Sequence, residues 1–284
     1  MKINFDIHSL DNSIEKFILK KLNTKPPYSY TKISSEELNN IYKEVIDKFP
    51  AEKTNNFSFD IIMSIRSDYM RDHIIETHLH VLSKEKSIIS DYNNNINLEQ
   101  LVIKYDAPPL NLLRIIFQKK YKKKLVKIIN EMEKLSKREK HELEWGLKHD
   151  IYSLPDQSEI QKKASEFEIK IEEFLNLVKI KYKTQLDLTN EQIKLLNKTV
   201  NTPDFLILDD FYINDFKVNW IDAKNFYGNK SKFVIRKIKS QTKKYIDTWG
   251  PGVIVFNCGF NSQLKFNDIF LIDYNSIKNY IINL

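Results

Sequence analysis

The chain has 284 residues and a formal net charge of +7, from 45 lysine and arginine residues against 38 aspartate and glutamate residues. Hydrophobic residues form 42% of the sequence, which excludes a disordered polyelectrolyte and suffices for a sizeable core without disulfides or metals. The single cysteine, Cys258, excludes a disulfide framework and indicates a reducing compartment, the nucleus or the cytoplasm. No apolar run reaches the roughly 18 residues of a membrane span, so we expect no membrane partner.

Residues 1–150 are predicted to form an all-helical region. Four of the five glycines lie in the C-terminal part of the chain, and only Gly146 lies earlier, so prolines and polar runs separate the elements of this half. Residues 35–49 and 60–82 carry apolar side chains at spacings of three and four, as in amphipathic helices. Within residues 98–117, two consecutive prolines end one predicted helix and start the next.

Residues 151–284 are predicted to form a mixed α/β domain. An amphipathic helix is expected over residues 158–181 and a basic helix over residues 232–248. Short runs rich in β-branched and aromatic residues, bounded by turn signals, predict strands. These runs cover residues 205–208, 216–223, 253–256 and 269–272. The order of helix, strands, helix and strands is typical of a domain that combines helices with a mixed sheet.

Two acidic residues and a lysine in this domain suggest chemistry. Asp222 and Lys224 are two residues apart at a strand end, so their side chains project to the same face. If the two flanking strands form a hairpin, its midpoint falls at residue 213, which sets Asp204 opposite Asp222. Two carboxylates suit Mg²⁺ or Mn²⁺, and a neighbouring lysine can orient a nucleophile or stabilise negative charge. The pattern predicts a phosphodiester-hydrolysis centre, and the alternative is a surface salt bridge on a solvated hairpin.

The motifs around these residues resemble a known family. In chain order they are Thr202-Pro203-Asp204, then Trp220-Ile221-Asp222-Ala223-Lys224, then Gln241-x-x-x-Tyr245, then Gly250-Pro251-Gly252 with an apolar strand, and finally Gly259-Phe260. This order is similar to that of the TPD family, the codanin-interacting nucleases. They are relatives of archaeal Holliday-junction resolvases in the PD-(D/E)xK superfamily. The resemblance covers about residues 165–260.

The resemblance implies a restriction-endonuclease-like core that hydrolyses DNA with Mg²⁺ or Mn²⁺. The ligands that it implies are Asp204, Asp222, the carbonyl of Ala223 and, directly or through a water, Glu168. It also implies that Lys224 is catalytic and that Gln241 contacts the substrate backbone or positions a water. A codanin-like protein partner follows from the family as well, and a homodimer from the resolvase relatives. Residues 98–117 are similar to the helix-turn-helix-like segment of the family, which would read DNA.

Three departures from the family pattern bear on the chemistry. Asp222 stands in place of the usual glutamate, and Ala223 in place of the usual serine. The carboxylate is therefore kept on a shorter side chain, which changes the metal geometry and leaves the chemistry feasible. Asn229 replaces an aspartate of the loop that follows, so the negative charge of that acid is missing here.

A basic segment follows the predicted centre. We expect its side chains to track the phosphates of a nucleic acid, and the alternative is a solvated helix face in a lysine-rich protein. The residues expected to contact nucleic acid are Lys230, Lys232, Arg236, Lys239, Lys243 and Tyr245. The substrate is expected to be DNA, branched or otherwise structured, with RNA left open.

Two other functions are compatible with the same residues. The first is a nucleic-acid-binding adaptor that has little turnover and acts through a partner such as codanin. The second is a purely structural interaction protein in which Asp204 and Asp222 pair with lysines.

Overall fold

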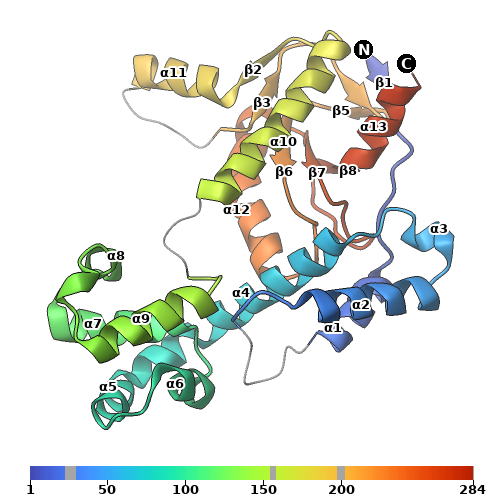
Figure 1. Ribbon diagram of the computed structural model, residues 1–284. Helices are drawn as coiled ribbons and strands as arrows, with labels where there is room; N and C mark the ends of the chain where they lie inside the picture. The colour runs from blue at the N-terminus through green and yellow to red at the C-terminus, as the bar shows by residue number, and fades with distance from the viewer. Residues whose placement is uncertain (23–29, 154–157, 197–201, 284) are drawn as a thin grey trace. The chain divides into compact units, whose positions relative to one another are not determined.

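The computed structural model of the chain describes residues 1–22, 30–153, 158–196 and 202–283 (Figure 1). These residues contain thirteen α-helices and two mixed sheets, so the protein combines α and β structure. The α-helices are α1 (Asn12–Lys21), α2 (Ser35–Lys48), α3 (Ala51–Thr54), α4 (Phe59–Ser83), α5 (Glu85–Asn93), α6 (Leu98–Tyr105), α7 (Pro109–Tyr121), α8 (Leu125–Ile129), α9 (Lys137–His149), α10 (Ser158–Leu177), α11 (Gln185–Leu196), α12 (Lys232–Trp249) and α13 (Tyr274–Ile282). The strands are β1 (Lys2–Ile3), β2 (Tyr182–Thr184), β3 (Phe205–Ile207), β4 (Tyr212–Ile213), β5 (Phe216–Lys217), β6 (Trp220–Lys224), β7 (Gly252–Phe256) and β8 (Ile269–Asp273). No helix in the described part of the chain is both long and apolar enough to cross a bilayer.

The chain divides into two compact units. The first, the sheet unit, comprises residues 1–18, 39–68 and 158–284, and the second, the helical unit, comprises residues 19–38 and 69–157. The sequence predicts a single all-helical region over residues 1–150, and the structure corrects this. Strand β1 lies in that region and pairs with β4, so part of the N-terminal half belongs to the sheet unit. Helical periodicity reports a buried face but does not tell which partner covers it.

The main sheet has five strands in the order β2-β3-β6-β7-β8. Strands β2, β3 and β6 are antiparallel neighbours, whereas β6, β7 and β8 run parallel. All four predicted strand runs are present, but the run at 216–223 is divided into β5 and β6. The sequence patterns of this domain did not predict β2, β4, α11 or α13. Strand β2 has only three residues, all partly exposed, so it has no hydrophobic alternation to recognise.

The two faces of this sheet carry separate cores. Residues of odd number in β6 and β7, such as Ile221 and Val255, pack with Phe167 and Ile171 of α10 and with Ile277 of α13. On the opposite face, Trp220, Ile254 and Phe256 pack with Val234, Ile238 and Tyr245 of α12. The alternation of side chains along a strand assigns each residue to its face. Asp222 and Lys224 therefore belong to the face that α12 covers (Figure 1).

The loop after β6 is held by buried polar contacts within the sheet unit. Glu15 of α1, which is 2% exposed, accepts hydrogen bonds from the Tyr227 hydroxyl at 3.2 Å, the Lys230 N–H at 3.2 Å and the Asn261 amide at 2.8 Å. Asn229 donates to Asp68 at 2.8 Å and accepts from the Ser231 N–H at 2.9 Å. An aspartate at position 229 would set a second buried carboxylate against Asp68, which is a physical reason for the asparagine here.

In the helical unit, the predicted helix pair at 98–117 is present as α6 and α7. Asn97 forms a capping box with Gln100 at the start of α6, and Pro109 occupies the first turn of α7. Two buried carboxylates accept hydrogen bonds from the same helix starts. Glu142 accepts from the Leu98 N–H at 3.0 Å and Asp150 from the Leu110 N–H at 3.0 Å. A role of helices α6 and α7 in reading DNA stays a prediction.

Candidate active site

Asp222 and Lys224 form a buried ion pair at the end of β6. The side chain of Asp222 is fully buried and that of Lys224 is 10% exposed, and the Lys224 Nζ contacts Asp222 Oδ2. Within the described part of the chain, this oxygen accepts no hydrogen bond of regular geometry, so the ion pair alone balances its charge. A buried carboxylate without a counter-charge is strongly unfavourable, and the fold tolerates Asp222 because Lys224 lies beside it.

Gln241 of α12 holds this pair in place. Its Oε1 accepts a hydrogen bond from Lys224 Nζ at 3.0 Å, and its Nε2 donates to Asp222 Oδ1 at 3.2 Å and to the Tyr245 hydroxyl oxygen at 3.1 Å. The Tyr245 hydroxyl in turn donates to the carbonyl oxygen of Thr202 at 2.7 Å. Gln241 thus orients both members of the ion pair, and its predicted contact with the substrate backbone or a water stays a prediction.

Tyr245 requires a correction. The sequence predicts that Tyr245 contacts nucleic acid together with the basic residues of the same helix. Its side chain is fully buried and packs edge-on against Trp220, with 5.3 Å between ring centroids. The ring is closed off from any nucleic acid, and the hydroxyl ties α12 to the segment that precedes Asp204. Helical spacing placed Tyr245 with Gln241, but it did not reveal that this face points into the core.

Asp204 lies where the hairpin arithmetic predicted it. Phe205 pairs with Ile221 and Leu206 with Trp220, a register that continues to Asp204 opposite Asp222. Asp204 Oδ2 accepts a hydrogen bond from the Ala223 N–H at 2.7 Å. Because the N–H and C=O of a strand residue point to the same side, the Ala223 carbonyl also faces the side on which Asp204 lies.

Glu168 of α10 is electrostatically linked to the same centre. Burial raises the pKa of Glu168, and the negative charge of Asp222 raises it further, while Lys224 acts in the opposite direction. Burial and Asp222 also raise the pKa of Asp204 well above its ordinary value, partly offset by Lys224 and by the Ala223 N–H. The carboxylates of Asp204 before β3, Asp222 in β6 and Glu168 in α10 therefore all interact electrostatically with Lys224.

The comparisons with known proteins bear on this part of the chain. Residues 135–275 match the family model described as protein of unknown function TPD sequence-motif. The matched range contains every residue of the centre, from Glu168 to Tyr245, and ends within α13. An uncharacterised protein of Acanthamoeba polyphaga mimivirus, named L539, is 26% identical over 125 residues. That alignment covers 43% of this chain and 44% of the viral protein, so the chain spans less than half the length of this relative. No solved structure matches the chain.

The donor set of the TPD-matched centre fits a hard divalent cation only in part. Asp204 and Asp222 supply carboxylate oxygens and Ala223 supplies a carbonyl directed to the same side. Among the residues that the structure describes, however, no three His, Cys, Asp or Glu side chains are grouped to hold a metal ion. Mg²⁺ is commonly bound by one or two carboxylates together with waters and substrate phosphate. The protein groups are compatible with that mode and not with a closed cage of side chains.

The basic residues of the TPD-matched segment lie mostly on the outer side of α12. Lys232, Arg236, Lys239 and Lys243 are exposed there. The Lys230 ammonium, in the preceding loop, donates to Gln263 at 2.8 Å. A groove of about 280 Å³ between α12 and the segment before β8 is lined by Lys239, Lys243 and Lys265, among other residues. Lys265 was not identified from the sequence, because the fold alone brings it next to α12.

Asp204→Asn is expected to stabilise the protein at pH 7 in the presence of a chelator, by about 1 kcal/mol. The substitution removes a charge whose burial is unfavourable and keeps an oxygen for the Ala223 N–H. The pKa of Asp204 is higher in the folded state than the unfolded value of about 3.9, so the native protein gains stability as pH falls through the folded-state pKa. The difference in the free energy of unfolding between Asp204→Asn and the native protein therefore shrinks toward zero near pH 4.

Urea unfolding between pH 4 and pH 8 measures this difference. Asp210→Asn serves as the control, because Asp210 lies on the exposed surface of the same unit. The control should follow the native protein at every pH. A constant difference between Asp204→Asn and the native protein across this range would contradict the burial of an ionised Asp204.

Proposed function

We propose that the sheet unit is a restriction-endonuclease-like nuclease that hydrolyses phosphodiester bonds in DNA with Mg²⁺ or Mn²⁺. The observation that carries the proposal is the convergence of Asp204, Asp222, Glu168 and Lys224 at the end of β6. Burial and the charge of Asp222 raise the pKa of both Asp204 and Glu168, and carboxylates perturbed in this way beside a lysine are concentrated in active sites. The mixed sheet, in which an antiparallel hairpin leads into parallel strands, supports the same assignment.

Each residue of the centre has a distinct role in this proposal. Asp204, Asp222 and the Ala223 carbonyl would hold the cation, with Glu168 reaching it directly or through a water. Once bound, the cation would lower the pKa of an attacking water and would stabilise negative charge on the phosphoryl oxygens. Lys224, held by Gln241, donates hydrogen bonds from its ammonium to the phosphate oxygen on which negative charge develops. Glu168, whose pKa is raised by burial, is a better proton acceptor than an exposed glutamate.

The proposal is tested with the purified full-length chain and DNA substrates that are branched, flapped or fully paired, with an RNA hairpin in parallel. Cleavage that requires Mg²⁺ or Mn²⁺ and is abolished in Asp222→Ala supports a nuclease. Binding of Mn²⁺, followed by its paramagnetic resonance signal, provides a second readout that does not depend on turnover. Cleavage that persists in Asp222→Ala would remove the centre from the reaction.

Lys239→Ala/Lys243→Ala is expected to weaken DNA binding and to reduce the slope of log K against log salt by about 2. Each lysine that contacts a phosphate releases about one counterion, and these two are one helical turn apart on the outer side of α12. Fluorescence anisotropy at several salt concentrations gives the slope. Lys16→Ala/Lys20→Ala, an exposed pair with the same spacing on α1, is the matched control and should leave the slope unchanged.

A second function is favoured by one specific observation. Lys224 and Gln241 already contact Asp222, so the protein's own side chains occupy the centre. This arrangement also suits a nucleic-acid-binding adaptor without meaningful turnover that acts through a protein partner such as codanin, alone or as a homodimer. DNA binding without cleavage of any substrate, and without Mn²⁺ binding, would favour the adaptor.

A further inference from the structure

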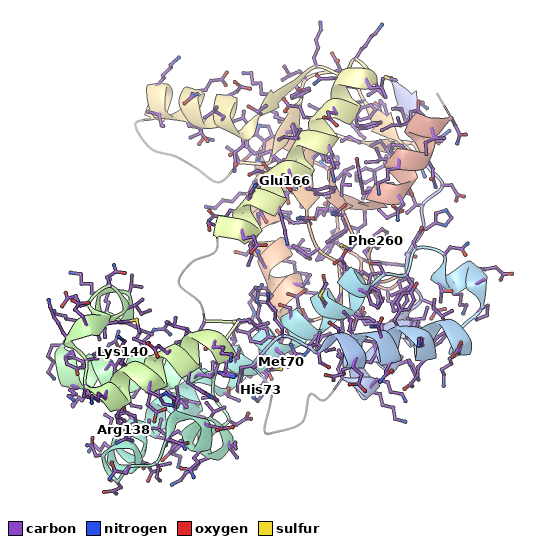
Figure 2. The ribbon with its side chains drawn as sticks, viewed as in Figure 1. Met70, His73, Arg138, Lys140, Glu166 and Phe260 are labelled. Carbon is purple, nitrogen blue, oxygen red and sulfur yellow. The ribbon has the colours of Figure 1, made fainter. Side chains whose placement is uncertain are left out.

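A cavity of about 500 Å³ lies at the C-terminal ends of β6 and β7, within the sheet unit. Asn225 and Asn257, the residues that directly follow these two strands, line it together with Cys258. Helix α4 contributes side chains that include Ser64 and Ser67, and α10 contributes side chains that include Glu166, which Figure 2 labels. Its volume falls within the range of about 300–1,000 Å³ that is typical of small-ligand sites.

The position of this cavity connects it to the candidate centre. Strands β6 and β7 are parallel, and ligands of open α/β sheets bind beyond the carboxyl ends of such strands. Asn225 is the residue next to Lys224, and Phe167, which also lines the cavity, is the residue next to Glu168. These neighbours along the chain place the cavity beside the backbone of the centre at both β6 and α10, although successive side chains such as Lys224 and Asn225 point to opposite faces.

The charges that line the cavity cancel. Lys163 and Lys170 of α10 are balanced by Glu166 of the same helix and by Asp60 of α4. Burial raises the pKa of Cys258 to about 12, so its thiol adds no charge. A groove that only followed phosphates would be lined by an excess of positive charge, as the groove beside α12 is. The balance therefore favours a ligand group that is polar and neutral.

Fixed amide and hydroxyl groups give the cavity its hydrogen-bonding character. Asn225 donates to the Lys163 carbonyl oxygen at 2.9 Å and accepts from the Asn257 amide at 2.7 Å, so both asparagines are held in a set orientation. Ser64 Oγ accepts from the Tyr227 N–H at 3.3 Å, which directs its own hydroxyl proton away from that bond. Side-chain amides and hydroxyls are the groups that read the polar edges of nucleobases.

We propose that this cavity receives an unpaired nucleobase beside the scissile phosphate. The inference rests on the proposed nuclease function and narrows its substrates to nucleic acids with an unpaired nucleotide at the cleavage site. Fully paired DNA would have to extrude a base first, at an energetic penalty that is smallest when the base is already unpaired. Flaps, bulges and branch points meet this requirement.

Equilibrium binding with a chelator present tests the proposal without turnover. Two probes are compared: a DNA duplex with one bulged adenosine, and the same duplex with an abasic residue in the bulge. We expect the native protein to bind the first about tenfold more tightly, the factor given by one or two uncharged hydrogen bonds. Asn257→Ala should abolish this preference. Lys239→Ala/Lys243→Ala should weaken binding of both probes equally and keep the preference.

A second variant guards against a structural effect of Asn257→Ala. Ser67→Leu narrows the cavity from α4 and leaves both asparagines in place, and it should reduce the preference as well. Asn279→Ala, at an exposed position of α13, is the control and should keep the preference. Equal binding of the two probes by the native protein, no binding of either, or a preference that survives both variants would overturn the proposal. If the protein prefers the bulged adenosine but cleaves no DNA, the nuclease assignment is wrong. If it cleaves DNA but shows no such preference, only the assignment of the cavity to a nucleobase is wrong.

Discussion

Lys224→Ala is expected to lower the rate constant of DNA cleavage by about 10²–10³-fold and to leave DNA affinity within about threefold. The ammonium lies at the candidate centre, where Gln241 orients it, and in the proposed mechanism it stabilises charge that develops only during the reaction. An interaction made only in the transition state affects kcat and not ground-state binding. Single-turnover cleavage and anisotropy titrations measure the two quantities separately.

The same substitution is expected to destabilise the fold by about 3 kcal/mol or more when no divalent metal is present. Asp222 is fully buried, and removal of Lys224 leaves its carboxylate without a counter-charge. The double variant Asp222→Asn/Lys224→Met removes both charges and should be less destabilised than the single variant. Urea unfolding in the presence of a chelator gives the free energies.

A surface ion pair in the same unit provides the matched control. Lys53 and Asp11 lie 2.7 Å apart with side chains 48% and 36% exposed, so Lys53→Ala should change stability by less than about 1 kcal/mol. If Lys224→Ala were as mild as this control, the pair would not be buried as described. If the native cleavage rate persisted in Lys224→Ala, the assignment of the lysine to the reaction would be wrong.

The local geometry of the centre was predictable because it depends on strand arithmetic. The side chains of Asp222 and Lys224 share a face through the two-residue repeat of a strand, and the midpoint of the hairpin places Asp204 opposite Asp222. Both predictions depend only on the register between the two strands, and the apolar residues that flank the motifs define that register.

Contacts between distant segments were not predictable in the same way. The burial of Tyr245 depends on Trp220, 25 positions earlier, and on the carbonyl of Thr202. The basic pattern of the helix shows its exposed side but does not tell what covers its other side. The two-residue strand β1 was not predictable either, because it exists only through its pairing with β4, more than 200 residues away along the chain.

Gly252→Ala is expected to destabilise the protein by about 3 kcal/mol and to lower its Tm by about 10 °C, at about 2–4 °C for each kcal/mol in a chain of this size. A Cβ at this position would lie 2.1 Å from Cδ2 of Trp220 and 2.2 Å from Cε2. The indole cannot simply turn away, because it is fully buried and its Nε1 donates to the Gly250 carbonyl at 2.9 Å. Calorimetry and urea unfolding give both values.

Gly259→Ala is the matched control for Gly252→Ala. A Cβ on Gly259 would meet nothing within 4 Å, but the residue has φ +76°, so only backbone strain of about 1–2 kcal/mol is expected. Comparison of the two variants separates the destabilisation caused by steric overlap, at position 252, from that caused by backbone strain, at position 259. Because the Trp220 ring packs on Tyr245, which holds Gln241, Gly252→Ala should also reduce cleavage in the protein that remains folded. A Gly252→Ala protein as stable as the control would mean that β7 does not approach the indole this closely.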